Sequence, residues 1–143
     1  MSSHNVVDQH IGFLVWDTER RIAREFAARA ARHGVNAGLV PFLRVLEHQD
    51  GITQQQLPAL VTMRSSTTAA AIQDLERQDL VCKVPSETDR RKTIVYLTEL
   101  GRELVKGISK EADQINELLR RRFSNVEAKQ LKSLLQRLRD NLR

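Results

Sequence analysis

The stretch Ser86–Gly101 reads S-E-T-D-R-R-K-T-I-V-Y-L-T-E-L-G, and it decides the fold. Its first half is polar and holds three consecutive cations, whereas its second half is an apolar run that includes Ile94 and Tyr96. A second β-prone run, Leu80–Val84, precedes it and is closed by Pro85. Two short strands that flank a polar loop predict a β-hairpin. The hairpin would hold the cations at its tip, away from any core.

The hairpin is followed by helical patterns that carry many leucines. Thr98 is a good N-cap residue for a long helix, and Ser124 with Glu127 forms a capping-box pattern for a final one. The apolar residues of these helices recur at near-heptad spacing: Leu100, Leu104, Ile108, Ile115, Leu118, Leu119, then Leu131, Leu134, Leu135, Leu138 and Leu142. A small core cannot absorb all of them, so we expect a dimer interface built from the N-terminal helix and both C-terminal helices.

The chain before the hairpin also reads as helices. Apolar residues recur at helical spacing from Asp8 to about Arg32, and Gly34 can take the left-handed position that ends a helix. Asn36 can cap a second helix that runs to about His48. Because Pro41 removes a backbone hydrogen bond, that helix should start late or bend.

A helix-turn-helix is predicted over residues 53–78. Thr53 and Gln56 form a capping box for a short helix from Gln54 to Val61, in which Pro58 makes the straightness doubtful. Residues 62–64 would form the turn, and Ser65 or Ser66 would cap a fourth helix that ends near Gln78. We expect its inward face to hold Ala69, Ile72 and Leu75, and its outer face to hold Thr67, Thr68, Ala70, Ala71 and Gln73.

Composition limits the class of protein. The chain has 143 residues, the size of one domain, with few aromatic residues and little glycine or proline. A single cysteine, no apolar run of about 20 residues and no signal-peptide pattern predict a cytoplasmic protein without a membrane span. The net charge is +5, but it is unevenly distributed. It is 0 for residues 1–61, +1 for residues 62–98 and +4 for residues 99–143, so most of the excess lies in the last third of the chain. Charge alone therefore supports nucleic-acid binding only weakly.

The order Asp89-x-Arg91 followed by Leu97-Thr98-x-x-Gly101 resembles the wing signature of the MarR family of bacterial transcription regulators. The resemblance continues upstream and covers about residues 51–101. It implies a mainly α fold with a small β-hairpin wing, a winged helix-turn-helix with a helical dimerisation region from both termini. Within a single domain, 1–143, residues 36–98 would form the DNA-binding lobe. Residues 5–34 and 99–143 would supply the dimerisation helices.

The resemblance also implies a function: a homodimeric regulator, a repressor in our interpretation, that binds a pseudo-palindromic DNA operator. The fourth helix would enter the major groove and the wing the minor groove. Arg91 would enter the minor groove, held by a salt bridge from Asp89. The residues that we expect to contact DNA are Arg64, Ser65, Ser66, Thr67, Thr68, Ala70, Asp89, Arg90, Arg91 and Lys92.

In the family, small ligands, often aromatic or phenolic anions, bind between the dimer helices and the DNA lobe. By that resemblance Trp16, Arg20, Phe42 and Arg44 are candidate pocket residues for a small-molecule effector. No catalytic motif, metal-ligand spacing or cofactor-binding loop is present, so we expect no enzyme, metal or cofactor. Two alternatives stay open: a winged-helix module that binds protein, and a regulator switched by a metal or by the Cys82 thiol.

Overall fold

A computed structural model describes residues 10–61 and 65–143, with only the backbone for Ser65 and Ser66. The helices and strands run in the order α1 (Ile11–Arg32), η2 (Ala37–Leu39), α2 (Val40–His48), β1 (Ile52–Thr53), α3 (Leu57–Val61), α4 (Ser65–Arg77), β2 (Val81–Pro85), β3 (Thr93–Leu97), α5 (Glu99–Arg120) and α6 (Asn125–Asp140), where η2 is a 3-10 turn. The predicted fold class, mainly helical with a small β-hairpin, is confirmed.

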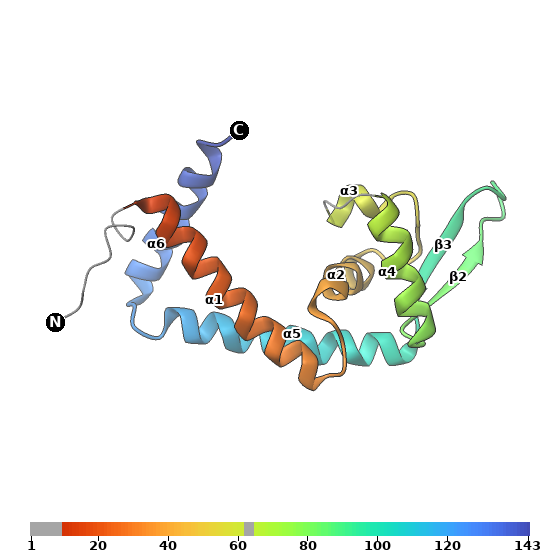
Figure 1. Cartoon of the computed structure of the whole chain (residues 1–143), viewed down its shortest axis with the longest axis horizontal. Helices are drawn as coiled ribbons and strands as arrows, with labels where there is room; N and C mark the ends of the chain where they lie inside the picture. The colour runs from red at the N-terminus through yellow and green to blue at the C-terminus, as the bar shows by residue number, and fades with distance from the viewer. Residues whose placement is uncertain (1–9, 62–64) are drawn as a thin grey trace.

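The elements divide between a lobe, which comprises the elements from η2 to β3, and an arm, which comprises α1, α5 and α6. Figure 1 shows α2, α3, α4 and the hairpin gathered at one end of the molecule, and α1 and α6 toward the other. The long helix α5 runs beneath the lobe and continues to α6, with α1 packed along it. This helix therefore connects the lobe to the rest of the arm.

The sheet has three antiparallel strands in the order β1-β3-β2. The predicted hairpin is confirmed, with Val81 opposite Leu97 and Pro85 opposite Thr93. The third strand was not predicted: Ile52 and Thr53 pair with Val95 and Ile94 of β3. Two residues are too few to show an alternating pattern, and their partners lie more than forty positions away in the chain.

The core lies where α2, α4, the sheet and α5 meet. Its fully buried side chains come from all four: Phe42, Leu43, Leu46, Ile72, Leu75, Val95, Val105 and Ile108. Because α5 contributes the last two, the base of the lobe and the start of the arm share one core. A shift of α5 would therefore disturb the packing of the lobe.

The predicted helix ends are confirmed where they depend on local chemistry. Gly34 has a φ of +75°, the left-handed conformation, directly after α1. Thr98 Oγ1 accepts from Gly101 N at 3.0 Å, and Ser124 Oγ accepts from Glu127 N at 3.1 Å. The side chain of Asn36 accepts from Gly38 N and caps η2. The α-helix starts only at Val40, so the late start predicted from Pro41 is confirmed.

The helix α3 is shorter than predicted. It begins at Leu57 rather than at Gln54, because residues 54–56 form a turn. The capping box itself is present: Thr53 N donates to Gln56 Oε1 at 3.0 Å, and Gln56 N donates to Thr53 Oγ1 at 3.2 Å. Pro58 is the second residue of the observed helix, a position where its missing N–H costs nothing.

Many large apolar side chains of the arm are exposed. In the described part of the chain they include Ile11, Leu14, Trp16, Leu118, Leu119, Phe123, Val126, Leu131, Leu134 and Leu135. No residue of α6 is buried. No helix among residues 10–61 and 65–143 is long and apolar enough to cross a membrane.

Candidate nucleic-acid interface

The helix α4 turns a different face to the core from the one predicted. Thr68 and Ala71 are buried, with exposed fractions of 1% and 7%, whereas Ala69 is exposed. The buried stripe is therefore Thr68, Ala71, Ile72 and Leu75, which follows the spacing i, i+3, i+4, i+7 of a helix face. Thr68 was wrongly predicted as a DNA contact: its side chain packs inward. Ala69, which we expected inside, lies outside.

The remaining predicted residues of the helix-turn-helix have three different outcomes. Thr67 and Ala70 are exposed on α4, as expected. Ser65 and Ser66 belong to the first turn of α4, but only their backbone is described. Arg64 lies outside the described residues, as does the whole predicted turn, 62–64.

The wing tip is a tight, hydrogen-bonded loop. Ser86 N donates to Lys92 O at 3.0 Å, and Lys92 N donates to Asp89 O at 2.9 Å. The Ser86 hydroxyl is largely buried and accepts from Asp89 N at 3.3 Å. These bonds close the loop on itself, so that its charged side chains emerge from a defined backbone.

Asp89 orients Arg91 at this tip. Arg91 Nε donates to Asp89 Oδ1 at 3.2 Å, and Arg91 N donates to the same oxygen at 3.1 Å. The guanidinium and backbone bonds from Arg91 lower the pKa of the Asp89 carboxyl below its ordinary value. The Arg91 side chain is nevertheless 92% exposed. The predicted salt bridge is confirmed, and it holds an exposed cation in one direction.

The wing tip also touches the helix-turn-helix. Gln55 Nε2, from the turn before α3, donates to the Arg91 carbonyl oxygen at 3.4 Å. Lower on the hairpin, Lys83 Nζ of β2 lies 3.4 Å from Glu76 Oε1 of α4. These contacts connect the wing to α4 and to the turn before α3.

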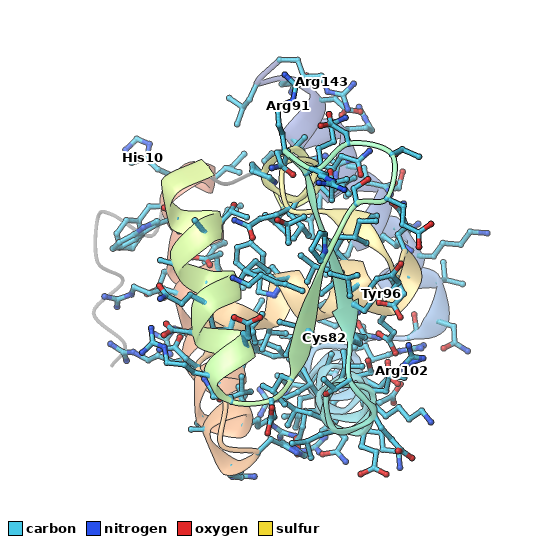
Figure 2. All side chains as sticks on the ribbon, turned by 90° about the vertical axis from the view of Figure 1, so that its right-hand side faces the viewer. His10, Cys82, Arg91, Tyr96, Arg102 and Arg143 are labelled. Carbon is cyan, nitrogen blue, oxygen red and sulfur yellow. The ribbon has the colours of Figure 1, made fainter. Side chains whose placement is uncertain are left out.

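The base of the wing is attached to α5. Asp50, in the turn after α2, accepts from Leu97 N at 2.8 Å and pairs with the guanidinium of Arg102 on α5. Figure 2 shows Arg91 at the far tip of the hairpin and Arg102 near its base, with Cys82 and Tyr96 between them. In Figure 1 the N-terminal end of α4 and the hairpin tip lie on the same side of the lobe, away from α5.

The four predicted ligand-pocket residues are not brought together. Phe42 is fully buried in the lobe core, away from the surface where the other three lie, and its role in a pocket stays a prediction. Trp16 is half exposed on α1, where the Arg20 guanidinium lies 5.0 Å from its ring centre and pairs with Asp17. Arg44 is exposed on α2. A cavity of about 490 Å³ between α1 and α5 is lined by other residues, among them Arg29, Gln114 and Arg121.

Sequence reasoning missed the contacts of Gln55, Lys83 and Asp50. The Gln55 and Asp50 contacts reach residues 36 and 47 positions away in the chain. Lys83 pairs with Glu76 of a different element, so no pattern within one helix or strand signals any of the three. Asp50 has a weak signal, because an Asp-Gly pair marks a turn. Nothing in the sequence indicates that its carboxylate reaches α5.

The comparisons with known proteins agree with this architecture. The family model described as MarR family matches residues 37–93, from η2 to the first residue of β3. An uncharacterised HTH-type transcriptional regulator of Bacillus subtilis, YdgJ, is 28% identical over 109 residues, which are 76% of this chain and 66% of the length of that relative. The alignment therefore leaves about a third of that relative unmatched.

Two solved structures extend the likeness over nearly the whole chain. A MarR transcriptional regulator from Methanosarcina mazei is 30% identical, with a TM-score of 0.80 over 92% of this chain and 94% of its own. The MepR–DNA complex of Staphylococcus aureus is 20% identical, with a TM-score of 0.83 over 92% of this chain and 98% of its own, and shows the shared fold. The names of the relatives agree with the prediction of a regulator rather than an enzyme. With its winged helix, its Asp89–Arg91 wing tip and these matches, the chain belongs to the MarR family.

Proposed function

We propose that the protein is a sequence-specific DNA-binding transcription regulator that acts as a repressor. The observation that carries this proposal is the common orientation of two features. The N-terminal end of α4 and the tip of the hairpin lie on the same side of the lobe (Figure 1), and Arg91 stands at that tip (Figure 2). Lys83 of β2 pairs with Glu76 of α4, and Gln55 donates to the Arg91 carbonyl oxygen. A helix in the major groove and an arginine in the adjacent minor groove require such a pair.

Each part of the lobe has a role in this proposal. The short side chains Thr67 and Ala70 allow α4 to approach the bases closely, and Ser65 and Ser66 stand at its N-terminal end, where hydroxyls can bond phosphates. Arg91 enters the minor groove, and Arg90 and Lys92, both exposed, lie beside it for phosphate contacts. Arg64, which precedes α4 in the sequence and lies outside the described residues, is a further candidate for contact with DNA.

The proposed assembly is a homodimer on a pseudo-palindromic operator. Its support is the exposed apolar surface of α1, α5 and α6, which water would otherwise cover at a cost of about 25 cal/mol per Å². Within this assembly residues 36–98 act as the DNA lobe, and residues 5–34 and 99–143 as the dimerisation region. A cytoplasmic location follows from this role.

The proposal includes release from DNA by a small effector, for which aromatic compounds are the first candidates. It rests on the family resemblance. The shared core of α5 and the lobe offers a route, because a ligand that shifts α5 would change the spacing of the two lobes. Trp16, Arg20, Phe42 and Arg44 stay candidates for ligand contact. For the thiol-switched alternative, Cys82 is free and exposed on β2, and Cys82→Ser would abolish peroxide-induced release.

Replacement of the wing arginine tests DNA binding directly. Affinity for a mixed-sequence duplex should be measured by fluorescence anisotropy at several salt concentrations, for the wild type and Arg91→Ala. We expect roughly 5- to 150-fold weaker binding, ~1–3 kcal/mol, and a salt slope smaller by about one unit. Arg122→Ala removes the same charge from an exposed site after α5, and should bind like the wild type.

The same titration separates the proposal from its competitor. A winged-helix module that binds protein would show no salt-dependent duplex binding in the wild type. If Arg91→Ala and Arg122→Ala lost duplex affinity equally, the binding would be a general attraction between charges. That result would contradict a wing that enters the groove.

A further inference from the structure

The centre of the exposed face of α4 differs from the pattern expected from sequence. Successive residues of a helix are rotated by about 100°. The direction opposite the buried stripe, Thr68, Ala71, Ile72 and Leu75, therefore passes through Ala70, Gln73 and Arg77. All three are exposed. Gln73 thus lies at the middle of the surface that the proposed function directs into the major groove.

The charged neighbours of Gln73 are already paired. Arg77 Nη2 lies 2.9 Å from Asp74 Oδ1, and Glu76 pairs with Lys83 of the hairpin. The Gln73 amide, in contrast, makes no hydrogen bond with any residue in the ranges 10–61 and 65–143. Along the described part of the helix, the exposed uncharged side chains with both a donor and an acceptor free for a base edge are Thr67, in the first turn, and Gln73, and only Gln73 has an amide that can make both bonds to one base.

The residues around it leave room for such a contact. Ala69 and Ala70, which precede Gln73 by about one turn, end at Cβ. They cannot reach a base edge by a hydrogen bond, and they do not hold the helix away from the groove. Gln73 extends beyond Cβ by one methylene group and an amide. Among the uncharged side chains of this segment, base-specific hydrogen bonds can therefore come from Gln73 or from residues in the first turn of α4.

We propose that Gln73 is a specificity-determining residue that reads an adenine in each half-site. A glutamine amide can accept from N6 and donate to N7 of adenine in the major groove, a pattern that none of the other three bases presents. The inference rests on the proposed function and deepens it: it assigns an A·T pair at one position of each half-site to this side chain.

The test uses duplexes that the wild-type protein selects from a random library. Dissociation constants are measured for the selected sequence and for single-base changes at each position, with the wild type and Gln73→Ala. The wild type should prefer A·T over the other pairs at one position per half-site by roughly 5- to 150-fold. In Gln73→Ala that preference should vanish, whereas the preferences at other positions persist. Replacement of that adenine by 7-deazaadenine, which lacks the N7 acceptor, should weaken DNA binding by the wild type but not by Gln73→Ala.

Two further variants make the outcome decisive. Gln73→Glu has the same length but only accepts, so the preference should move from A·T toward C·G at the same position, because a carboxylate accepts from N4 of cytosine. Gln78→Ala removes an exposed amide just after α4 and should keep the wild-type preferences. If Gln73→Ala keeps every preference of the wild type, the inference is overturned while the proposed function stands. If the wild type selects no sequence, both are overturned.

Discussion

At the scale of single residues, Gly101 determines how closely α5 approaches the hairpin. A Cβ atom at this position would overlap the carbonyl oxygen of Leu80. That oxygen is already in use, because it accepts from Thr98 N at 3.1 Å. Since Thr98 also caps α5 through Gly101 N, one residue without a side chain permits the cap, the strand end and the helix to meet.

The prediction at this scale concerns Gly101→Ala. The added methyl group meets backbone rather than a flexible side chain, so the wing base must move. We expect a loss of about 1–3 kcal/mol in the free energy of unfolding, measured by urea denaturation. Gly12→Ala is the matched control, because its methyl group would meet nothing within 4 Å. Alanine is the better helix former, so the control should be neutral or more stable. Equal stability of both variants would contradict the close packing at Gly101.

Residue-level predictions from sequence succeed where the partner is a near neighbour in the chain. The caps at Thr53 and Thr98 are of this kind, because their geometry follows from a three-residue spacing. The orientation of α4 could not be predicted in the same way. Thr68 and Ala69 differ little in size and polarity from their neighbours, so an Ala- and Thr-rich helix gives no clear apolar stripe. Only the packing against the lobe core decides between them.

At the scale of elements, a polar network joins α1 to α5. Arg29 Nη1 donates to Glu111 Oε2 at 3.0 Å and to Gln114 Oε1 at 2.8 Å. His33 Nε2 lies 3.1 Å from Glu111 Oε1. The hydrogen bonds from His33 and Arg29 lower the pKa of the Glu111 carboxyl below its ordinary value of 4.5. Glu111 is therefore the shared acceptor between the two helices.

This network predicts a pH dependence. A carboxyl whose pKa is lowered by folding stabilises the native state above its ordinary pKa, and this contribution is lost as the pH falls through the folded value. The wild type should therefore lose stability below pH 4.5 more steeply than Glu111→Gln. Urea denaturation at pH 7, 4.5 and 3, at one protein concentration, measures the difference. Glu103 is exposed on α5, so the stability of the control variant Glu103→Gln should change with pH as that of the wild type does. A pH-independent difference between the wild type and Glu111→Gln would contradict the account.

Sequence patterns identified most elements but not all of their limits. Long amphipathic helices such as α1 and α5 are evident from periodicity. The two-residue strand β1 exists because β3 offers a free edge, so it is a tertiary effect. The burial of Phe42 is also a tertiary effect: its position on α2 was correct, but only the packing of α4, α5 and the sheet determines that this face is fully buried.

At the scale of the whole molecule, many large apolar side chains of α1, α5 and α6 are left exposed by the described residues of the chain. The groove between α5 and α6 has a volume of about 580 Å³, and the apolar residues that line it include Leu119, Phe123, Leu131 and Leu135. Leu134, which also belongs to α6, is 54% exposed. A second copy of the chain would cover such a surface and set the distance between two DNA lobes.

The prediction for assembly is that Leu134→Arg dissociates the dimer. A charge buried in an apolar interface without a partner costs several kcal/mol, so the mass from light scattering should fall from two chains to one. Operator affinity should fall with it, because the two half-sites would be bound independently. Ser133→Arg adds the same charge at the neighbouring exposed position and should stay dimeric. A wild type that is monomeric at micromolar concentration would contradict the proposed assembly.

The most direct measurement is the selection of duplexes from a random DNA library by the purified protein, at low and at physiological salt. The account predicts an inverted repeat whose half-site centres lie about 10 base pairs, or one helical turn, apart, and which stays enriched at the higher salt. Binding that disappears at physiological salt and enriches no motif would contradict it, because the winged helix would then not read DNA sequence.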